Sequence, residues 1–286
     1  MDCENVAVSP HSSGMRTESR ILYMDEHLAV FNKAAGDICE TIDSGASAVK
    51  NGAFAEDGGD GTVLKHSVCE SCCLPDVFTA YLKKSAPDVL PPSFVHCFNR
   101  LDRPVSGAVL LVFNRALIPL LQNQFTAQQK EDGGIKKLYW AVLEGRIPPK
   151  TDCMLLEHYI RFDAKRQKSF VYDKAGRKTK KARLLWRPVF CTDRYTFAEI
   201  RLLSGRTHQI RAQLAHTGYH IKGDVKYGSR RADNLGGIRL HAAQLRFMHP
   251  VTKRVIDVRA PLLKLDALWN ACIHSDAEQA EEYGKS

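Results

Sequence analysis

The chain has 286 residues, of which 44% are hydrophobic, and a formal net charge of +9. This is enough apolar material for the core of one large domain or two modest ones. No apolar run approaches the roughly 20 residues that a membrane-spanning helix needs. The first residues also lack the apolar core of a secretory signal, so we expect an intracellular protein.

Nine cysteines in such a chain are more naturally free thiols than a disulfide framework. His66, Cys69, Cys72 and Cys73 resemble a zinc-binding set, but two adjacent cysteines are poorly placed to close a tetrahedral site, and no matching CxxC lies elsewhere. Gly-rich phosphate loops, HExxH and GxSxG motifs are not found in the sequence. We therefore expect neither a metal nor a cofactor.

The predicted elements indicate one domain over residues 20–265. The first part of the chain is predicted to contain a tail over 1–19, a hairpin of strands 21–23 and 28–31, a Gly/Ser/Asp-rich insertion over 40–72 and a helix over 76–82 capped by Asp76. The middle part has a buried strand at 108–113, a helix at 118–128 and strands at 139–143 and 197–203. The last part has a helix from 208 to about 217, closing strands at 238–247 and 255–258, and a C-terminal helix and acidic tail over 266–286. Many strands, few helices and no regular βαβ alternation favour an α+β fold.

The positive charge is concentrated in one region. Residues 136–187 contain fifteen Lys and Arg against five Asp and Glu, a local balance of +10. The densest part holds Arg177, Lys178, Lys180 and Lys181. Such a region attracts a polyanion and predicts contact with nucleic-acid phosphates, whereas an isolated charge run of this kind is otherwise a solvated basic hairpin.

Asp102 is the candidate reactive group. It lies between Arg100 and Arg103 on a polar turn before the buried strand at 108–113, where a strand can hold a reactive side chain in a cleft. Taken alone, such an aspartate is more often a surface ion pair. A second arginine, remote in sequence, would make it a site.

Arg211 offers that partner. Together with Arg206 and His208 it gives the start of the predicted helix a basic face, and a buried arginine can keep a carboxylate ionised. Tyr139 is predicted in a strand, on the face opposite to Trp140. Its ring suits an unstacked base and its hydroxyl suits a weak general base, although a core tyrosine is the plain alternative.

The ordered motifs resemble the RluA-type pseudouridine synthases. They are residues 99–107 (NRLDRPVSG), 137–145 (KLYWAVLEG), 203–228 (LSGRTHQIRAQLAHTGYHIKGDVKYG), 240–250 (LHAAQLRFMHP) and the pair Ala260 and Pro261. The resemblance covers about residues 21–263. It implies a mixed, largely antiparallel β-sheet flanked by helices, with a central RNA-binding cleft, and isomerisation of uridine to pseudouridine in RNA without cofactor or metal.

The resemblance also implies roles for particular residues. Asp102 corresponds to the catalytic aspartate, Tyr139 to the active-site tyrosine and Arg211 to the arginine that pairs with the aspartate. Arg100 corresponds to the residue that helps fill the space of the extruded nucleotide. Arg206, His208 and Gln209 are then expected to bind or position RNA, together with the basic run from Arg177 to Lys181.

Three positions depart from the family pattern: Asn99 replaces a usual histidine, Val105 a threonine and Ala34 a proline. The first two remove potential hydrogen bonds, which keeps open an RNA-binding or ribosome-assembly protein that has lost catalysis. A nuclease using Asp102 and His208 would lack a second carboxylate for metal. The sequence identifies neither the RNA nor the uridine, and nothing in it requires an oligomer.

Overall fold

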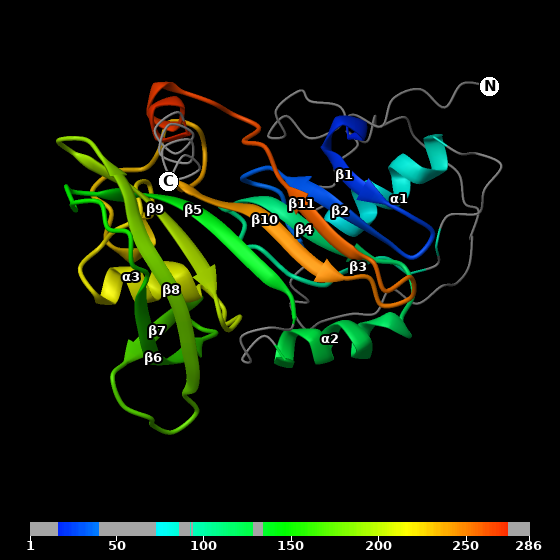
Figure 1. Ribbon diagram of the computed structural model, residues 1–286, viewed down its shortest axis with the longest axis horizontal. Helices are drawn as coiled ribbons and strands as arrows, with labels where there is room; N and C mark the ends of the chain where they lie inside the picture. The colour runs from blue at the N-terminus through cyan, green and yellow to red at the C-terminus, as the bar shows by residue number, and fades with distance from the viewer. Residues whose placement is uncertain (1–16, 40–72, 86–91, 93, 128–133, 274–286) are drawn as a thin grey trace, which may run out of the picture.

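The computed structural model describes residues 17–39, 73–85, 92, 94–127 and 134–273 (Figure 1). Most of the predicted tail, the whole predicted insertion and the acidic end of the chain lie outside these residues. Within the described part, no helix is both long and apolar enough to cross a membrane.

Eleven strands and a few helices make up the described chain. The strands are β1 (Ile21–Met24), β2 (Leu28–Lys33), β3 (His96–Cys97), β4 (Ser106–Val112), β5 (Lys136–Glu144), β6 (Met154–Asp163), β7 (Lys168–Tyr172), β8 (Lys180–Cys191), β9 (Tyr195–Leu202), β10 (Leu240–Met248) and β11 (Val255–Arg259). The helices are α1 (Leu74–Ser85), α2 (Leu117–Ala127) and α3 (Gln209–His216), with short 3-10 turns η1 (Glu18–Arg20) and η2 (Val225–Tyr227) and a helical segment at 267–273.

All of these strands belong to one sheet. Its order is β1-β2-β4-β10-β5-β9-β8-β6-β7, with β3 also on β4 and β11 also on β10. Every pairing is antiparallel except that of β4 with β10. The predicted α+β class with a mixed, largely antiparallel sheet is therefore confirmed.

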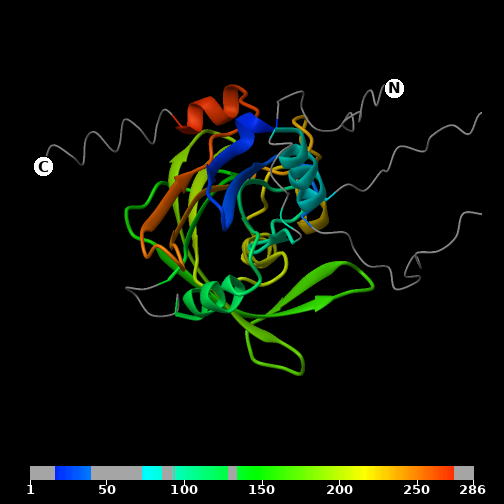
Figure 2. The same cartoon turned by 90° about the vertical axis from the view of Figure 1, so that its right-hand side faces the viewer.

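The two faces of the sheet carry different helices. Alternate residues of β4 and β5 pack with α1 and α3 on one face, and the residues between them pack with α2 and the segment 267–273 on the other. In the side view, the β6–β7 hairpin extends beyond the sheet on the side that α1 and α3 occupy (Figure 2). The face of α1 and α3 also holds Tyr139, Leu101 and Val105, and therefore carries the candidate site.

Gly107 allows the parallel pair to form. It has φ +115°, and a Cβ atom at this position would overlap the backbone oxygen of Ala242. Only glycine adopts this backbone conformation readily and permits so close an approach of two strands. The β4–β10 junction depends on this residue.

Two details of the predicted elements are wrong. Helix α1 begins at Leu74, so Asp76 lies in its first turn, where its carboxylate accepts hydrogen bonds from the backbone N–H (3.4 Å) and the thiol (3.0 Å) of Cys73 instead of capping the helix from outside. Strands β6 to β8 were not predicted. Polar residues and exposed apolar ones such as Leu155 and Phe162 give β6 no simple buried alternation.

Candidate active site

The loop between β3 and β4 presents Asp102. Its backbone turns through a hydrogen bond from Val105 N–H to the Asp102 carbonyl at 3.0 Å. The Lys33 ammonium, which is fully buried, donates to the carbonyl oxygens of Asp102 (3.3 Å), Arg103 (3.1 Å) and Val105 (2.6 Å). Burial lowers the pKa of Lys33 to about 8. The buried Lys33 therefore fixes the backbone of this loop, while the Asp102 side chain stays 22% exposed.

Arg211 joins that carboxylate to a second one. Its Nη1 donates to Asp102 Oδ2 at 2.8 Å, while Nε and Nη2 form a fork on the two oxygens of Asp224 at 2.6 and 2.9 Å. The side chains of Arg211 and Asp224 are only 5% and 2% exposed. Burial works against the charge of Arg211, but the bonds and charges of Asp224 and Asp102 outweigh it and raise its pKa. The arginine is therefore a fixed cation beside Asp102.

Tyr139 lies on β5 in the same core cluster as the Asp102 loop, while Trp140 packs in the cluster of the opposite face, as the strand alternation predicted. Burial raises the pKa of Tyr139 well above its ordinary value, and the charge of Asp102 raises it further. The phenol consequently stays protonated at physiological pH. The ring, more than a phenolate base, is what this residue offers.

His208 continues the polar network beside Arg211. It precedes α3 in a left-handed conformation (φ 54°), and its Nδ1 lies 2.8 Å from the hydroxyl of Tyr227, which also accepts the backbone N–H of Ser169 at 2.8 Å. Its Nε2 lies 3.8 Å from Asp102 Oδ2. Burial lowers the pKa of His208, so the imidazole is neutral near pH 7.

Two of the three residues that depart from the family pattern, Asn99 and Val105, have side chains that point into the protein. The Asn99 side chain donates to the carbonyl of Ala108 at 3.0 Å and accepts the N–H of Leu110 at 2.6 Å. Val105 is 3% exposed and packs in the core. Asn99 therefore holds the start of β4, and its substitution does not take a hydrogen bond away from the Asp102 carboxylate.

The other predicted RNA-contacting residues differ in position. Gln209 is buried, and its amide bonds within the protein to Ser204, to the backbone N–H of Arg206 and to the carbonyl of Arg183. Arg206 lies before α3, and its Nε donates to the Lys181 carbonyl at 3.0 Å. Both residues thus position the entry to α3. Those that the structure leaves exposed are Arg100, Arg177, Lys178, Lys180 and Lys181.

Sequence reasoning missed three residues of the site: Lys33, Asp224 and Tyr227. A lysine in the run Leu28–Lys33, otherwise almost wholly apolar, was the available signal for the first. Asp224 and Tyr227 fall in the quoted motif 203–228, but only the fold shows that they bind Arg211 and His208.

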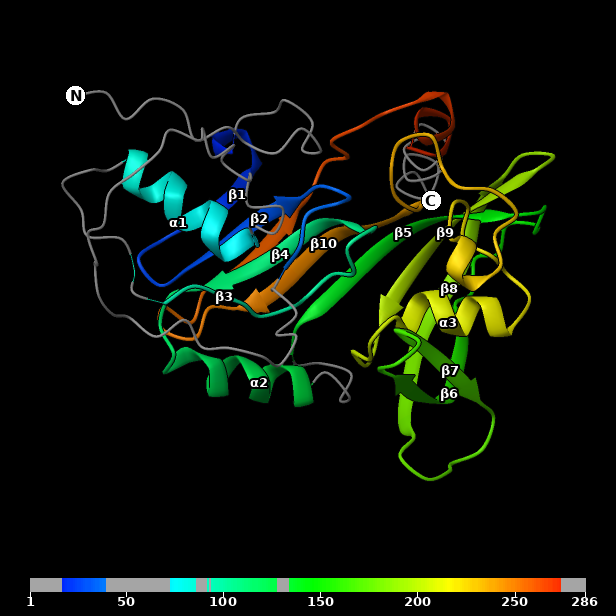
Figure 3. The same ribbon diagram turned by 180° about the vertical axis from the view of Figure 1, so that it is seen from behind.

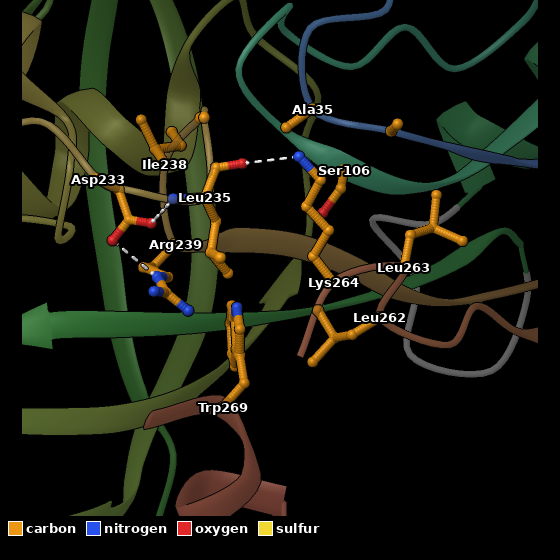
Figure 4. Close-up of a pocket in the computed structure, with 13 residues that line it drawn as sticks. Ala35, Ser106, Asp233, Leu235, Ile238, Arg239, Leu262, Leu263, Lys264 and Trp269 are labelled. Carbon is orange, nitrogen blue, oxygen red and sulfur yellow. Dashed lines mark hydrogen bonds and ion pairs between the residues drawn. The ribbon is translucent and has the colours of Figure 1, made fainter. Parts of the chain in front are cut away.

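A small cavity is lined by Ser106 at the start of β4, by residues of the segment 233–239 and by Leu262, Leu263, Lys264 and Trp269 (Figure 4). Its wall includes the ion pair of Asp233 with Arg239 and the Lys264 ammonium bonded to the Leu235 carbonyl at 3.2 Å. The loop at Gly237 touches Pro104 here, and a Cβ at Gly237 would lie 2.8 Å from the Pro104 carbonyl oxygen. The cavity holds about 50 Å³, which is room for a few waters.

A known protein family matches the greater part of the chain. The family model described as RNA pseudouridylate synthase matches residues 27–216, well over half of the chain. The chain belongs to the RNA pseudouridylate synthase family. Asp102, Tyr139 and Arg211 lie inside the matched region. The predicted membership of the RluA-type synthases is confirmed.

Two relatives and one solved structure illustrate what this chain is similar to. The ribosomal large subunit pseudouridine synthase C of Vibrio vulnificus is 27% identical over 248 residues, covering 85% of this chain and 65% of that protein. A protein of Chloroflexus aurantiacus named as an uncharacterized RNA pseudouridine synthase is 35% identical over 174 residues, covering 60% of this chain and 51% of the other. The structure of human RNA pseudouridylate synthase domain containing 4 superposes with a TM-score of 0.60 at 19% identity, covering 91% of this chain and 93% of the other, which shows a shared fold. The chain thus spans about two thirds or less of the length of these two sequence relatives.

Proposed function

We propose that this protein isomerises specific uridines to pseudouridine in a structured RNA. The observation that carries the proposal is the ion pair between Arg211 and Asp102, on the sheet face that also holds Tyr139. Family membership supplies the reaction class, and the ion pair supplies a partly exposed carboxylate with a fixed counter-charge.

The reaction rearranges bonds without oxidation or reduction. The bond from the sugar C1′ to N1 of uracil breaks, the base turns, C5 joins C1′, and the proton on C5 is lost while N1 gains one. Asp102 starts this sequence, either by attack on the sugar or by removal of a sugar proton. Both routes need an ionised carboxylate, and Arg211 holds that charge in place.

Tyr139 serves as a surface on which the uracil stacks while it turns. Its raised pKa argues against a resting phenolate that would take the C5 proton. The uridine must first leave its helix, at a cost of roughly a few kcal/mol. Phosphate contacts from the basic segment between β7 and β8 offset this cost.

The alternative of a binding protein without catalysis was suggested by Asn99 and Val105. Because the Asn99 amide bonds the backbone of Ala108 and Leu110, its change from the family pattern gives no physical reason for lost chemistry. We therefore favour the enzyme.

The deciding experiment is a transcriptome-wide pseudouridine map of cells that carry wild-type protein, Asp102→Asn or the control Asp152→Asn, whose carboxylate is exposed and distant in sequence from the site. We expect Asp102→Asn to remove a discrete set of sites, with a turnover loss of about 10³-fold or more, while Asp152→Asn leaves the map unchanged. A map that Asp102→Asn leaves intact would overturn the proposal. Retained RNA binding would then favour the binding protein.

A further inference from the structure

A second cluster of polar side chains lies away from Asp102. It consists of His158 on β6, Asp173 just after β7 and His216, the last residue of α3. One potential ligand atom from each residue lies within 4.8 Å of the others. His216 Nε2 is 2.9 Å from Asp173 Oδ1, and the ring centroids of His158 and His216 are 5.1 Å apart. Residues of the β6–β7 hairpin thus meet the end of α3, which is remote from that hairpin in sequence.

From this geometry we propose a site for a divalent transition metal, with Zn²⁺ as the fitting ion, held by His158, Asp173 and His216. Two imidazoles and one carboxylate are a donor set that zinc accepts, with a fourth position open to water. Zinc binds such atoms at about 2.0–2.2 Å, so the cluster must contract around the ion. The side chains of His216 and Asp173 are 34% and 78% exposed and are free to make that movement.

Gln213, which is fully buried, completes the surroundings of His158. Its Nε2 lies 3.0 Å from His158 Nδ1, while its Oε1 has no hydrogen-bond partner among the described residues. Metal binding at the ring's Nε2 puts the ring proton on Nδ1. A half-turn of the Gln213 amide would let Oε1 accept a hydrogen bond from that N–H, at the expense of long bonds from its Nε2 to the carbonyls of Ala182 (3.3 Å) and Leu156 (3.4 Å).

The ion would join the end of α3 to the β6–β7 hairpin, which projects beside the helix (Figure 3). Arg211 lies in the first turn of the same helix and faces Asp102, whereas His216 ends it. The metal would therefore brace the β6–β7 hairpin against α3 and take no part in the reaction. This inference does not depend on the proposed activity.

The test is Co²⁺ and Zn²⁺ binding to the full-length protein, with wild type, His216→Ala, Asp173→Asn and the control His27→Ala. His27 lies in the β1–β2 turn, far along the sheet from this cluster. We expect wild type and His27→Ala to bind one equivalent of metal that His216→Ala and Asp173→Asn bind at least about 10-fold more weakly. Circular dichroism checks that each variant is folded.

The Co²⁺ spectrum distinguishes this site from metal held by cysteines elsewhere in the chain, such as Cys69 and Cys72. Nitrogen and oxygen ligands give visible bands without the near-ultraviolet thiolate charge-transfer band. Loss of only the thiolate-free component in both variants supports the site. Equal metal binding in wild type and both variants, or a spectrum that is entirely thiolate in character, would overturn it.

Discussion

At the scale of single residues, the site depends on a cation shared between two carboxylates. Arg211 donates two hydrogen bonds to Asp224 and one to Asp102. We propose that Asp224 is a positioning residue, which acts on the Asp102 carboxylate only through the arginine. A guanidinium with one rigid anchor presents its remaining donor in a fixed direction.

Replacing Asp224 by Asn should separate this positioning role from the chemistry. The amide is nearly isosteric but leaves the buried charge of Arg211 half compensated, so we expect a loss of about 2 to 4 kcal/mol in unfolding free energy and a lower kcat. Urea unfolding and single-turnover kinetics measure the two effects. The exposed control Asp152→Asn should change neither, and unaltered stability in Asp224→Asn would contradict the anchoring role.

A second residue-scale prediction concerns pH. His241 is fully buried between the Ser106 hydroxyl (2.8 Å) and the Ala260 carbonyl (2.9 Å), and burial lowers its pKa from 6.5 to about 4. As pH falls below 6.5, the unfolded chain takes up a proton before the native protein does. Stability present above pH 6.5 is thus lost towards pH 4, by up to about 3 kcal/mol.

Urea unfolding at pH 6.5 and pH 4.5 tests this in wild type and His241→Gln. Other groups also titrate in this range, so the informative quantity is the difference between the two proteins. We expect a smaller decrease for His241→Gln. Equal decreases would show that His241 does not govern this part of the pH dependence.

At the scale of elements, the β6–β7 hairpin and its connection to β8 carry the exposed cations. Arg177, Lys178 and Lys180 lie in or beside that connection, and all three are exposed. Replacing them by Ala should weaken RNA binding about tenfold at moderate salt. It should also reduce the slope of log K against log salt by about 0.7 to 0.9 for each phosphate that the variant no longer neutralises.

Filter binding over a salt series gives both quantities. Lys83→Ala with Lys84→Ala is the matched control, since these exposed cations lie at the end of α1. An unchanged salt slope in the triple variant would exclude the connection from the RNA interface.

The same elements show where prediction from sequence succeeds. The hairpin 21–31, the strand at 108–113 and the strand at 139–143 were found because their apolar residues form strong patterns and a polar turn bounds them. Strands β6 to β8 were missed because many of their residues are polar or half-exposed, which leaves only a weak apolar pattern in the sequence. The pairing of Asp102 with Arg211 could be anticipated, whereas the partners of Lys33 could not, because they are backbone carbonyls that carry no sequence signal.

At the scale of the whole molecule, one junction holds the two parts of the site together. Asp102 belongs to the part built on β2 and β4, whereas Tyr139 and Arg211 belong to the part built on β5 to β9 and α3. In the sheet these parts meet only through β10. The geometry of the site therefore depends on the contacts that β4 and β5 make with β10.

Gly107→Ala tests the junction. The new methyl group would meet the Ala242 backbone, so we expect a loss of about 3 kcal/mol or more in unfolding free energy and a fall in kcat. Gly145→Ala is the matched control, because Gly145 also has positive φ (+93°) but a Cβ atom there would meet nothing within 4 Å, and it should lose only about 1 kcal/mol. Similar losses in both variants would show that strain, and not the strand contact, sets the effect.

The order of the strands also bears on how the protein is made. During synthesis β10 emerges after β1 to β9, yet its place is between β4 and β5. Until about residue 248 has left the ribosome, the two completed parts have no strand to join them, and Asp102 cannot be held against Arg211. The exposed cations between β7 and β8 are therefore synthesised before the site that we propose as active can assemble.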